Sequence, residues 1–224
     1  MSESSHTSVQ GKTRVKICGI TSVNDALNAV RCGADAIGLV FYSSSPRYVT
    51  VKQAAEIAYA VGPFVTVTGL FVNESAEFVE QVLRQVPLQL LQFHGDETVE
   101  FCEQFSRPYI KAMRMRDGLN VDEAIAGYSS AIGVLLDTYR AGVPGGTGEK
   151  FDWDRVPETP ACPIILAGGL TPDNVAAAVA QVKPYGVDVS GGVESTPGQK
   201  SSSKVEVFIR NATTYNATRC NISK

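Results

Sequence analysis

Short apolar runs rich in Val, Ile and Leu alternate along the chain with stretches in which apolar residues are spaced as on one face of a helix. Apolar runs of this length are typical of strands, and the intervening stretches are typical of amphipathic helices. The pattern therefore predicts an α/β protein in which strands and helices alternate. The predicted strands are 14–18, 35–41, 64–72, 88–93, 109–113, 132–137, 163–167 and 186–190.

A helix is predicted after each of these strands. The predicted helices are 23–32, 51–61, 75–84, 97–105, 120–127, 152–156, 172–181 and 202–211, of which 152–156 has the weakest pattern. Ser22 and Ser75 stand where a side chain can cap the first turn of a helix. Pro172 stands at a first-turn position where its missing N–H costs nothing. Gly33 follows the first helix and is expected to end it.

The spacing of the strands indicates the tertiary arrangement. Strand starts recur about every 25 residues, the length of one βα unit, and no long linker or change of composition divides the chain. Eight successive βα units with right-handed crossovers can form an open doubly wound sheet or a closed barrel, and the number eight favours closure. We therefore predict a single-domain (β/α)8 TIM barrel at 13–211, between a disordered tail at 1–12 and a polar tail at 212–224.

The composition of the 224-residue chain agrees with one globular domain. Hydrophobic residues make up 44% and charged residues 19% of the chain, so there is enough apolar material for a large core. The formal net charge of −3 offers no basic field of the kind that nucleic-acid binding requires. The N-terminal residues lack the features of a secretory signal, and no apolar run reaches the roughly 18 residues that span a bilayer. We therefore expect a cytoplasmic protein without nucleic-acid or membrane partners.

The five cysteines are scattered along the chain, without a C-x-x-C pair or a nearby cluster of histidines. This spacing offers no metal site of the zinc type, so we expect reduced thiols and no bound metal. Candidate chemistry is instead sought at the carboxyl ends of the predicted strands, where (β/α)8 barrels place their active sites.

The first and sixth predicted strands end in Cys18 and Asp137. A lone cysteine in a strand is ordinarily a small buried hydrophobe, but the end of a barrel strand places this thiol at the catalytic rim. A carboxylate after uncharged, mostly apolar residues needs a partner or a role, although a simple cap at a strand end is the alternative. Because strands one and six lie three steps apart in a ring of eight, the two groups are expected to face each other across the mouth as an acid and a base.

Two further polar residues follow predicted strands. Arg47 stands behind the rigid Pro46 in the loop after the second strand, and a guanidinium fork suits a carboxylate or a phosphate. A solvated loop arginine is the alternative. His94 follows the fourth strand and is expected to donate a hydrogen bond to a substrate, although a lone histidine is more often structural.

Glycine-rich loops follow the last three strands, at 142–148, 168–169 and 191–192. Glycine lets backbone N–H groups converge on an anion, and the loops after strands seven and eight are where such barrels commonly hold a phosphate. Ser190 can add a hydroxyl donor. The predicted phosphate-binding residues are Gly146, Gly168, Gly169, Ser190, Gly191 and Gly192.

Six ordered motifs together resemble the phosphoribosylanthranilate isomerase family over about residues 14 to 210. The motifs are KICGIT (16–21), SPRYV (45–49), LQFHGDE (91–97), GGTG followed by FDW (145–153), LAGGLTPDNV (166–175) and VDVSGGVE (187–194). Each could arise by chance, but their order and spacing are specific. Many relatives carry a second serine where this chain has Gly191, which loses a hydroxyl but keeps its N–H.

The resemblance implies a (β/α)8 barrel that converts N-(5-phosphoribosyl)anthranilate into 1-(2-carboxyphenylamino)-1-deoxyribulose 5-phosphate by an Amadori rearrangement. It implies no cofactor and a small-molecule substrate, and it leaves open whether the chain is a monomer or a homodimer. By the same resemblance, Asp137 is the general acid that opens the ribose ring and Cys18 the general base that removes the C2 proton. Arg47 resembles the residue that holds the anthranilate carboxylate.

Four rival interpretations remain at this point. A metal-dependent sugar-phosphate epimerase would need several His and Asp ligands, whereas the chain has two histidines. Indole-glycerol-phosphate synthase would call for lysine at key strand ends, whereas the first strand ends in Cys18. Another phosphate-binding barrel isomerase, or a barrel that only binds a sugar phosphate, would share the glycine loops, but a mere binder has no need for Cys18 and Asp137 together.

Overall fold

The computed structural model describes residues 12–138 and 152–220, and the first eight strands along the chain form one closed barrel. Each strand pairs in parallel with the next, and β1 pairs with β8 to complete the ring. The predicted TIM barrel is thereby confirmed. The strands are β1 (Arg14–Cys18), β2 (Ala36–Val40), β3 (Thr66–Phe71), β4 (Leu90–Phe93), β5 (Tyr109–Arg114), β6 (Gly133–Asp137), β7 (Ile164–Leu166) and β8 (Gly186–Val189).

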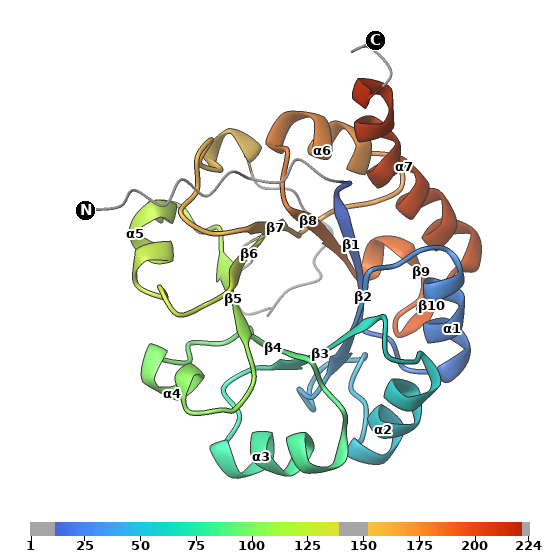
Figure 1. Cartoon of the computed structure of the whole chain (residues 1–224), viewed down its shortest axis with the longest axis vertical. Coiled ribbons are helices and arrows are strands. Elements are labelled where there is room, and N and C mark those ends of the chain that lie inside the picture. Colours follow the sequence, from blue (N-terminus) through green and yellow to red (C-terminus); the bar gives the residue numbers. More distant parts are fainter. Residues whose placement is uncertain (1–11, 139–151, 221–224) are drawn as a thin grey trace.

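Helices surround the barrel on the outside, as Figure 1 shows in a view that looks into the ring of strands. They are α1 (Val23–Arg31), α2 (Val51–Ala60), α3 (Ala76–Gln85), α4 (Val99–Glu103), α5 (Val121–Ala126), α6 (Val175–Val182) and α7 (Ser202–Cys220), with a 3-10 turn, η1 (Trp153–Arg155), in the sixth slot. After β8 come a second 3-10 turn, η2 (Gly191–Val193), and a small hairpin of β9 (Glu194–Thr196) and β10 (Gln199–Lys200), which the sequence pattern did not predict. No helix in the described part of the chain is both long and apolar enough to cross a membrane.

Most of the predicted helix signals act as expected. Ser22 and Ser75 each accept a hydrogen bond from a backbone N–H in the first turn of their helices. Gly33 follows the C-cap of α1 with a φ of +97°, a left-handed conformation that glycine adopts without strain. The prediction for Pro172 is wrong, because α6 begins only at Val175. The Asn174 side chain accepts from the Thr171 N–H and holds Pro172 in a preceding turn.

The predicted end of the last helix is also wrong. α7 continues to Cys220, through residues that were expected to form a polar tail from 212 onward. Ala212 is fully buried against the rest of the protein, so the helix still gains packing beyond 211. The hydroxyls of Thr213 and Thr214 bond to helix carbonyls one turn back, which satisfies polar groups within the helix. Residues 1–11 of the predicted N-terminal tail lie outside the described residues.

The main hydrophobic core lies between the barrel and its helices. Phe41 and Phe71, at neighbouring strand positions, stack with ring centroids 5.2 Å apart, and Phe93 continues this layer 6.3 Å from Phe71. Side chains alternate along each strand, so Ile17 belongs to this outer core, whereas Cys18 belongs to a separate small cluster inside the barrel. This alternation is what directs the polar residues of the strands toward the barrel axis.

A buried ion pair between Lys111 on β5 and Glu97 fixes the loop that follows β4. Lys111 Nζ lies 2.8 Å from Glu97 Oε2 and also donates to the Gly95 carbonyl at 2.7 Å. The Glu97 carboxylate accepts from the backbone N–H groups of Asn73 and Gly95. The two side chains are only 4% and 2% exposed, so each depends on the other for compensation of its charge.

Replacing Lys111 with methionine should therefore cost about 3–5 kcal/mol of unfolding free energy, because Glu97 is left as an uncompensated buried charge. Urea denaturation at neutral pH measures the loss. The matched control is Lys52→Met on α2, where the lysine is exposed and the change should stay within about 0.5 kcal/mol. Equal stability of the two variants would contradict this role of the pair.

Candidate active site

A cavity of about 450 Å³ opens at the carboxyl ends of the barrel strands. Its lining includes all the predicted site residues that the structure describes: Cys18, Arg47, His94, Asp137, Gly168, Gly169, Ser190, Gly191 and Gly192. Gly146 lies outside the described residues. The cavity is therefore large enough for a small molecule and combines acid–base groups with the glycine loops.

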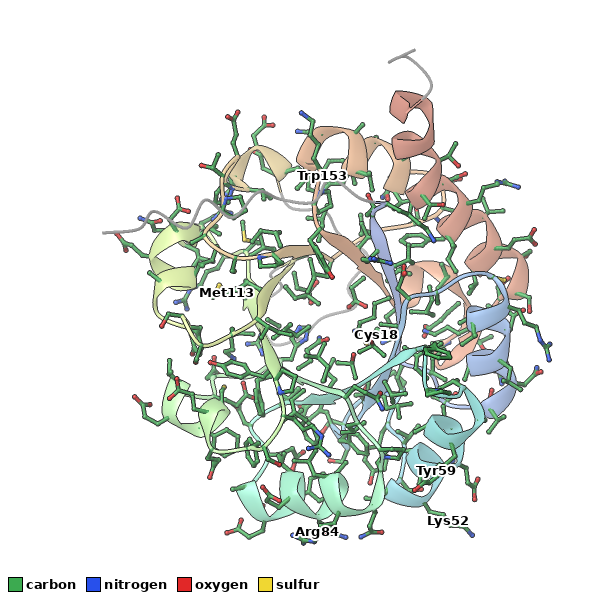
Figure 2. All side chains as sticks on the ribbon, viewed as in Figure 1. Cys18, Lys52, Tyr59, Arg84, Met113 and Trp153 are labelled. Atoms are coloured by element: carbon green, nitrogen blue, oxygen red, sulfur yellow. The ribbon has the colours of Figure 1, made fainter. Side chains whose placement is uncertain are left out.

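Cys18 lies at the end of β1 in the interior of the ring, where Figure 2 labels it. Gly38 on the neighbouring β2 makes room for the thiol, because a Cβ built there would lie 2.7 Å from the Cys18 sulfur. Gly19 continues the chain with a φ of +71°, and a Cβ there would collide with the Arg47 side chain. Gly38 thus makes room for the thiol, and Gly19 makes room for the Arg47 side chain beside it.

An ion pair lies beside the thiol inside the barrel. Lys16 precedes Cys18 by two positions on the same face of β1, and its Nζ lies 2.9 Å from Asp188 Oδ1 on β8. Burial raises the pKa of the Cys18 thiol, the Lys16 ammonium that contacts it opposes this rise, and the Asp188 carboxylate adds to it. The balance leaves the pKa of the Cys18 thiol above its ordinary value. The thiolate is therefore a minor form at neutral pH, but it is a strong base where it forms.

Arg47 does not present a free guanidinium fork to the cavity. Its Nε and Nη2 each donate to one oxygen of Glu194 at 2.8 Å, a bidentate pair. Lys200 Nζ lies 2.7 Å from Glu194 Oε1 and also donates to the Ser190 carbonyl. Burial pushes the pKa of Glu194 up, but Arg47 and Lys200 outweigh it, so this pKa lies below its ordinary value. In the described part of the chain, Nη1 of Arg47 has no hydrogen-bond partner.

Asp137 ends β6 in a buried position and has contacts at both carboxylate oxygens. Oδ1 accepts from the Thr138 N–H at 2.8 Å, and Oδ2 lies 3.1 Å from Nε2 of His94. The other ring nitrogen of His94 lies 2.9 Å from the amide nitrogen of Gln92. Both ring nitrogens therefore have protein partners, whereas the sequence analysis expected His94 to donate to the substrate.

The loops after β7 and β8 pack closely on each other and on the end of β6. Gly168 and Gly169 have φ values of +77° and +62°, and a Cβ on Gly168 would lie 2.9 Å from Asp137 Oδ1. A Cβ on Gly192 would collide with the carbonyl of Leu170. Ser190 also lines the cavity, and its hydroxyl is buried without a hydrogen-bond partner among the described residues.

Sequence reasoning missed several residues of this site. Lys16 and Asp188 were available from the two-residue period of a strand, since each charge stands inside an apolar run on the face that points inward. Glu194 and Lys200 had no such signal, because the contacts of Glu194 with Arg47 and with Lys200 depend on the hairpin of β9 and β10, which was not predicted. Within residues 12–138 and 152–220, no group of three His, Cys, Asp or Glu side chains could hold a metal ion.

The fold and the cavity together define a (β/α)8-barrel enzyme. The model of the "N-(5'phosphoribosyl)anthranilate (PRA) isomerase" family matches residues 15–211, and the chain belongs to this family. It is 60% identical over 195 residues to the N-(5'-phosphoribosyl)anthranilate isomerase of Cellvibrio japonicus, covering 87% of this chain and 91% of the relative. The relative from Pseudomonas fluorescens strain Pf0-1 is 60% identical over 196 residues, covering 88% and 96%.

Solved structures agree. The phosphoribosylanthranilate isomerase of Thermotoga maritima superposes with a TM-score of 0.79 at 39% identity, covering 89% of this chain and 98% of that chain. A complex of a phosphoribosylanthranilate isomerase with reduced 1-(o-carboxyphenylamino)-1-deoxyribulose 5-phosphate superposes with a TM-score of 0.76, also at 39% identity and with coverage of 89% and 98%. The chain thus catalyses the isomerisation of phosphoribosylanthranilate in tryptophan biosynthesis, and the rival interpretations fall.

The environment of Cys18 predicts an alkaline dependence of its reactivity. The thiolate is the nucleophile toward iodoacetamide, and burial raises the thiol pKa, so the thiolate appears only at higher pH. The inactivation rate should therefore keep rising above about pH 8.5, the ordinary thiol value. Loss of activity and the mass of the labelled peptide measure this rate, and in Cys18→Ser the site should not be labelled. A rate that levels off below that pH would contradict the raised pKa.

Proposed function

We propose that Asp137 and Cys18 are the acid and the base of the rearrangement. Asp137 gives a proton to the ribose ring oxygen, the C1–O bond breaks with its electrons on that oxygen, and the nitrogen lone pair forms the Schiff base. The Cys18 thiolate then removes the C2 proton, which the cationic Schiff base has made acidic, and an enolamine forms. The enolamine becomes the ketone when the Cys18 thiol returns its proton to C1 and the 2-hydroxyl loses its own proton. The observation that carries this proposal is that both groups line one cavity, on strands three steps apart in the ring.

Lys16 and Asp188 support the base in this proposal. A thiol with a raised pKa is a stronger base once ionised, and the Lys16 ammonium lies where it can stabilise the thiolate. The Asp188 carboxylate holds that ammonium in place at 2.9 Å. Lys16, held in place by Asp188, therefore limits how far burial raises the thiol pKa without removing its basicity.

Arg47 is proposed to bind the anthranilate carboxylate through its outer amino group. The pair with Glu194 uses one edge of the guanidinium and holds its plane, so Nη1 remains for the ligand. A preorganised donor loses less conformational freedom on binding than a solvated loop arginine does. His94 is proposed to act on Asp137 and not on the substrate, because Asp137 occupies its Nε2.

The phosphate is proposed to bind between the loops after β7 and β8, at Gly168, Gly169, Gly191, Gly192 and the hydroxyl of Ser190, with Gly146 from the loop after β6. Support comes from the lining of the cavity by these loops and from the unpartnered Ser190 hydroxyl. Backbone N–H groups of glycine loops suit a phosphate because no Cβ blocks its approach.

Substitutions should separate chemistry from binding. Cys18→Ser and Asp137→Asn should each lower kcat by about 10²–10⁴ with KM within a few-fold, because a hydroxyl is too weak a base and an amide cannot give up the proton. Arg47→Ala should mainly raise KM. The fluorescence decay of added phosphoribosylanthranilate measures both constants. Near-normal kcat in Cys18→Ser or Asp137→Asn would remove that residue from the proposed chemistry.

The phosphate site is best tested at Ser190, because side chains at Gly192 would collide with backbone before they reached a ligand. Ser190→Ala should weaken the binding of inorganic phosphate and of product analogues about tenfold or more, the value of a hydrogen bond to a charged group. Calorimetric titration measures this loss, with Ser203→Ala on the exposed surface of α7 as control. Unchanged affinity in Ser190→Ala would place the phosphate elsewhere.

A further inference from the structure

Gln92 is fully buried on β4 and has one unexplained polar atom. Its Nε2 lies 2.9 Å from Nδ1 of His94, while its Oε1 has no hydrogen-bond partner among the described residues. Gln92 and His94 stand two positions apart on one face of β4, and His94 reaches Asp137 on β6. Gln92 does not line the cavity, so it lies behind His94 as seen from a substrate. The three side chains form a continuous buried row that ends at the proposed acid.

The row can exist in two arrangements that differ by one proton. A neutral imidazole has one donor and one acceptor nitrogen, so the end of the Gln92 amide that faces Nδ1 decides the tautomer. If the amide N–H faces Nδ1, then Nε2 carries the hydrogen and donates to an ionised Asp137. If the amide has turned over, Oε1 accepts from Nδ1–H, and Nε2 is left as an acceptor for a protonated Asp137.

Either end of the amide fits the site. The oxygen and nitrogen of a glutamine amide have nearly the same shape, and the other end has no competing partner within residues 12–138 and 152–220 that would fix the orientation. The remaining charged groups on this side act on the backbone. Arg114 from β5 donates to the carbonyl of His94, and the pair of Lys111 and Glu97 holds Gly95. Asp137 is thus the charged group that the structure places against the ring.

We propose that Gln92 and His94 are positioning residues that hold the catalytic proton on Asp137, an inference that rests on the proposed role of Asp137 as the acid. In the acid-competent arrangement, Gln92 Oε1 accepts from Nδ1–H and one proton is held between His94 Nε2 and Asp137 Oδ2. That proton passes from Oδ2 to the ring oxygen of the substrate as the C1–O bond breaks. As the enolamine becomes the ketone, the 2-hydroxyl proton returns to Asp137 and the Cys18 thiol gives its proton to C1, so both groups regain their starting protonation states within one turnover.

The chain suits a direct spectroscopic test, because it has only two histidines, His6 and His94. In a His6→Ala background, the ¹⁵N signals of one imidazole report its tautomer and its protonation. As the pH falls, the ring should pass from a form with Nδ1 unprotonated to one with Nδ1 protonated. Gln92→Glu places a carboxylate against Nδ1–H and should move this transition up by about one pH unit. Gln92→Met removes the acceptor and should move it down.

Kinetics provide the second measurement. His94→Gln can still donate to Asp137 but cannot carry a proton, so kcat should fall about tenfold or more while KM stays within a few-fold. In Gln92→Glu, the alkaline limb of the plot of kcat against pH should move to higher pH by the same interval as the ¹⁵N transition. The matched control is Gln104→Glu at the exposed end of α4, which should change neither. A merely structural role of Gln92 would shift neither the transition nor the limb.

The outcomes distinguish this inference from the function on which it rests. Full kcat in Asp137→Asn would contradict both the role of Asp137 as the acid and the positioning role of Gln92 and His94. An inactive Asp137→Asn, combined with wild-type kcat in His94→Gln and an unmoved transition in Gln92→Glu, would overturn the positioning role of Gln92 and His94 and leave Asp137 as the acid. If Gln92→Glu does not fold, Gln92→Met and His94→Gln carry the same decision, and an unmoved transition in Gln92→Met together with normal kcat in His94→Gln overturns the proposal.

Discussion

The parallel pairing of β1 with β8 is the contact on which the active site depends. It closes the barrel, and its register sets Lys16 opposite Asp188. Two residues that are 172 positions apart in the chain thereby form one ion pair inside the barrel. Cys18 follows Lys16 on the same face, so closure also brings the thiol to the loop after β8, which carries Ser190. An open sheet made of the same strands would separate these groups.

Closure also explains why the site contains so many paired charges. A charge inside a barrel loses its hydration and is tolerated only with a partner. Lys16 therefore has Asp188, and Glu194 has both Arg47 and Lys200. These ion pairs compensate the buried charges, and they also determine which donor and acceptor atoms remain for a ligand. Glu194, for example, occupies Nε and Nη2 of Arg47. The pKa of the Cys18 thiol, for example, depends on both Lys16 and Asp188.

Much of the fold and the outline of the site could be predicted from the chain. All eight barrel strands occur within two residues of the predicted bounds, because buried strands must be apolar runs wherever they pair. The strand ends then identified Cys18 and Asp137, since the carboxyl ends of parallel strands share one edge of a barrel. Local caps such as Ser22 were also predictable, because their bonds reach only three residues along the chain.

What failed or was missed depends on contacts between distant segments. His94 bonds to Asp137, 43 positions away, and Arg47 bonds to Glu194, 147 positions away, so neither partner has a local signal. The end of α7 was missed because the burial of Ala212 against the rest of the protein prolongs a helix whose own sequence is polar. The sequence by itself determined the elements and which residues stand at the strand ends, since both follow from local periodicity. Only the tertiary structure decided which charges and hydrogen-bond donors meet, because closure of the ring sets their distances.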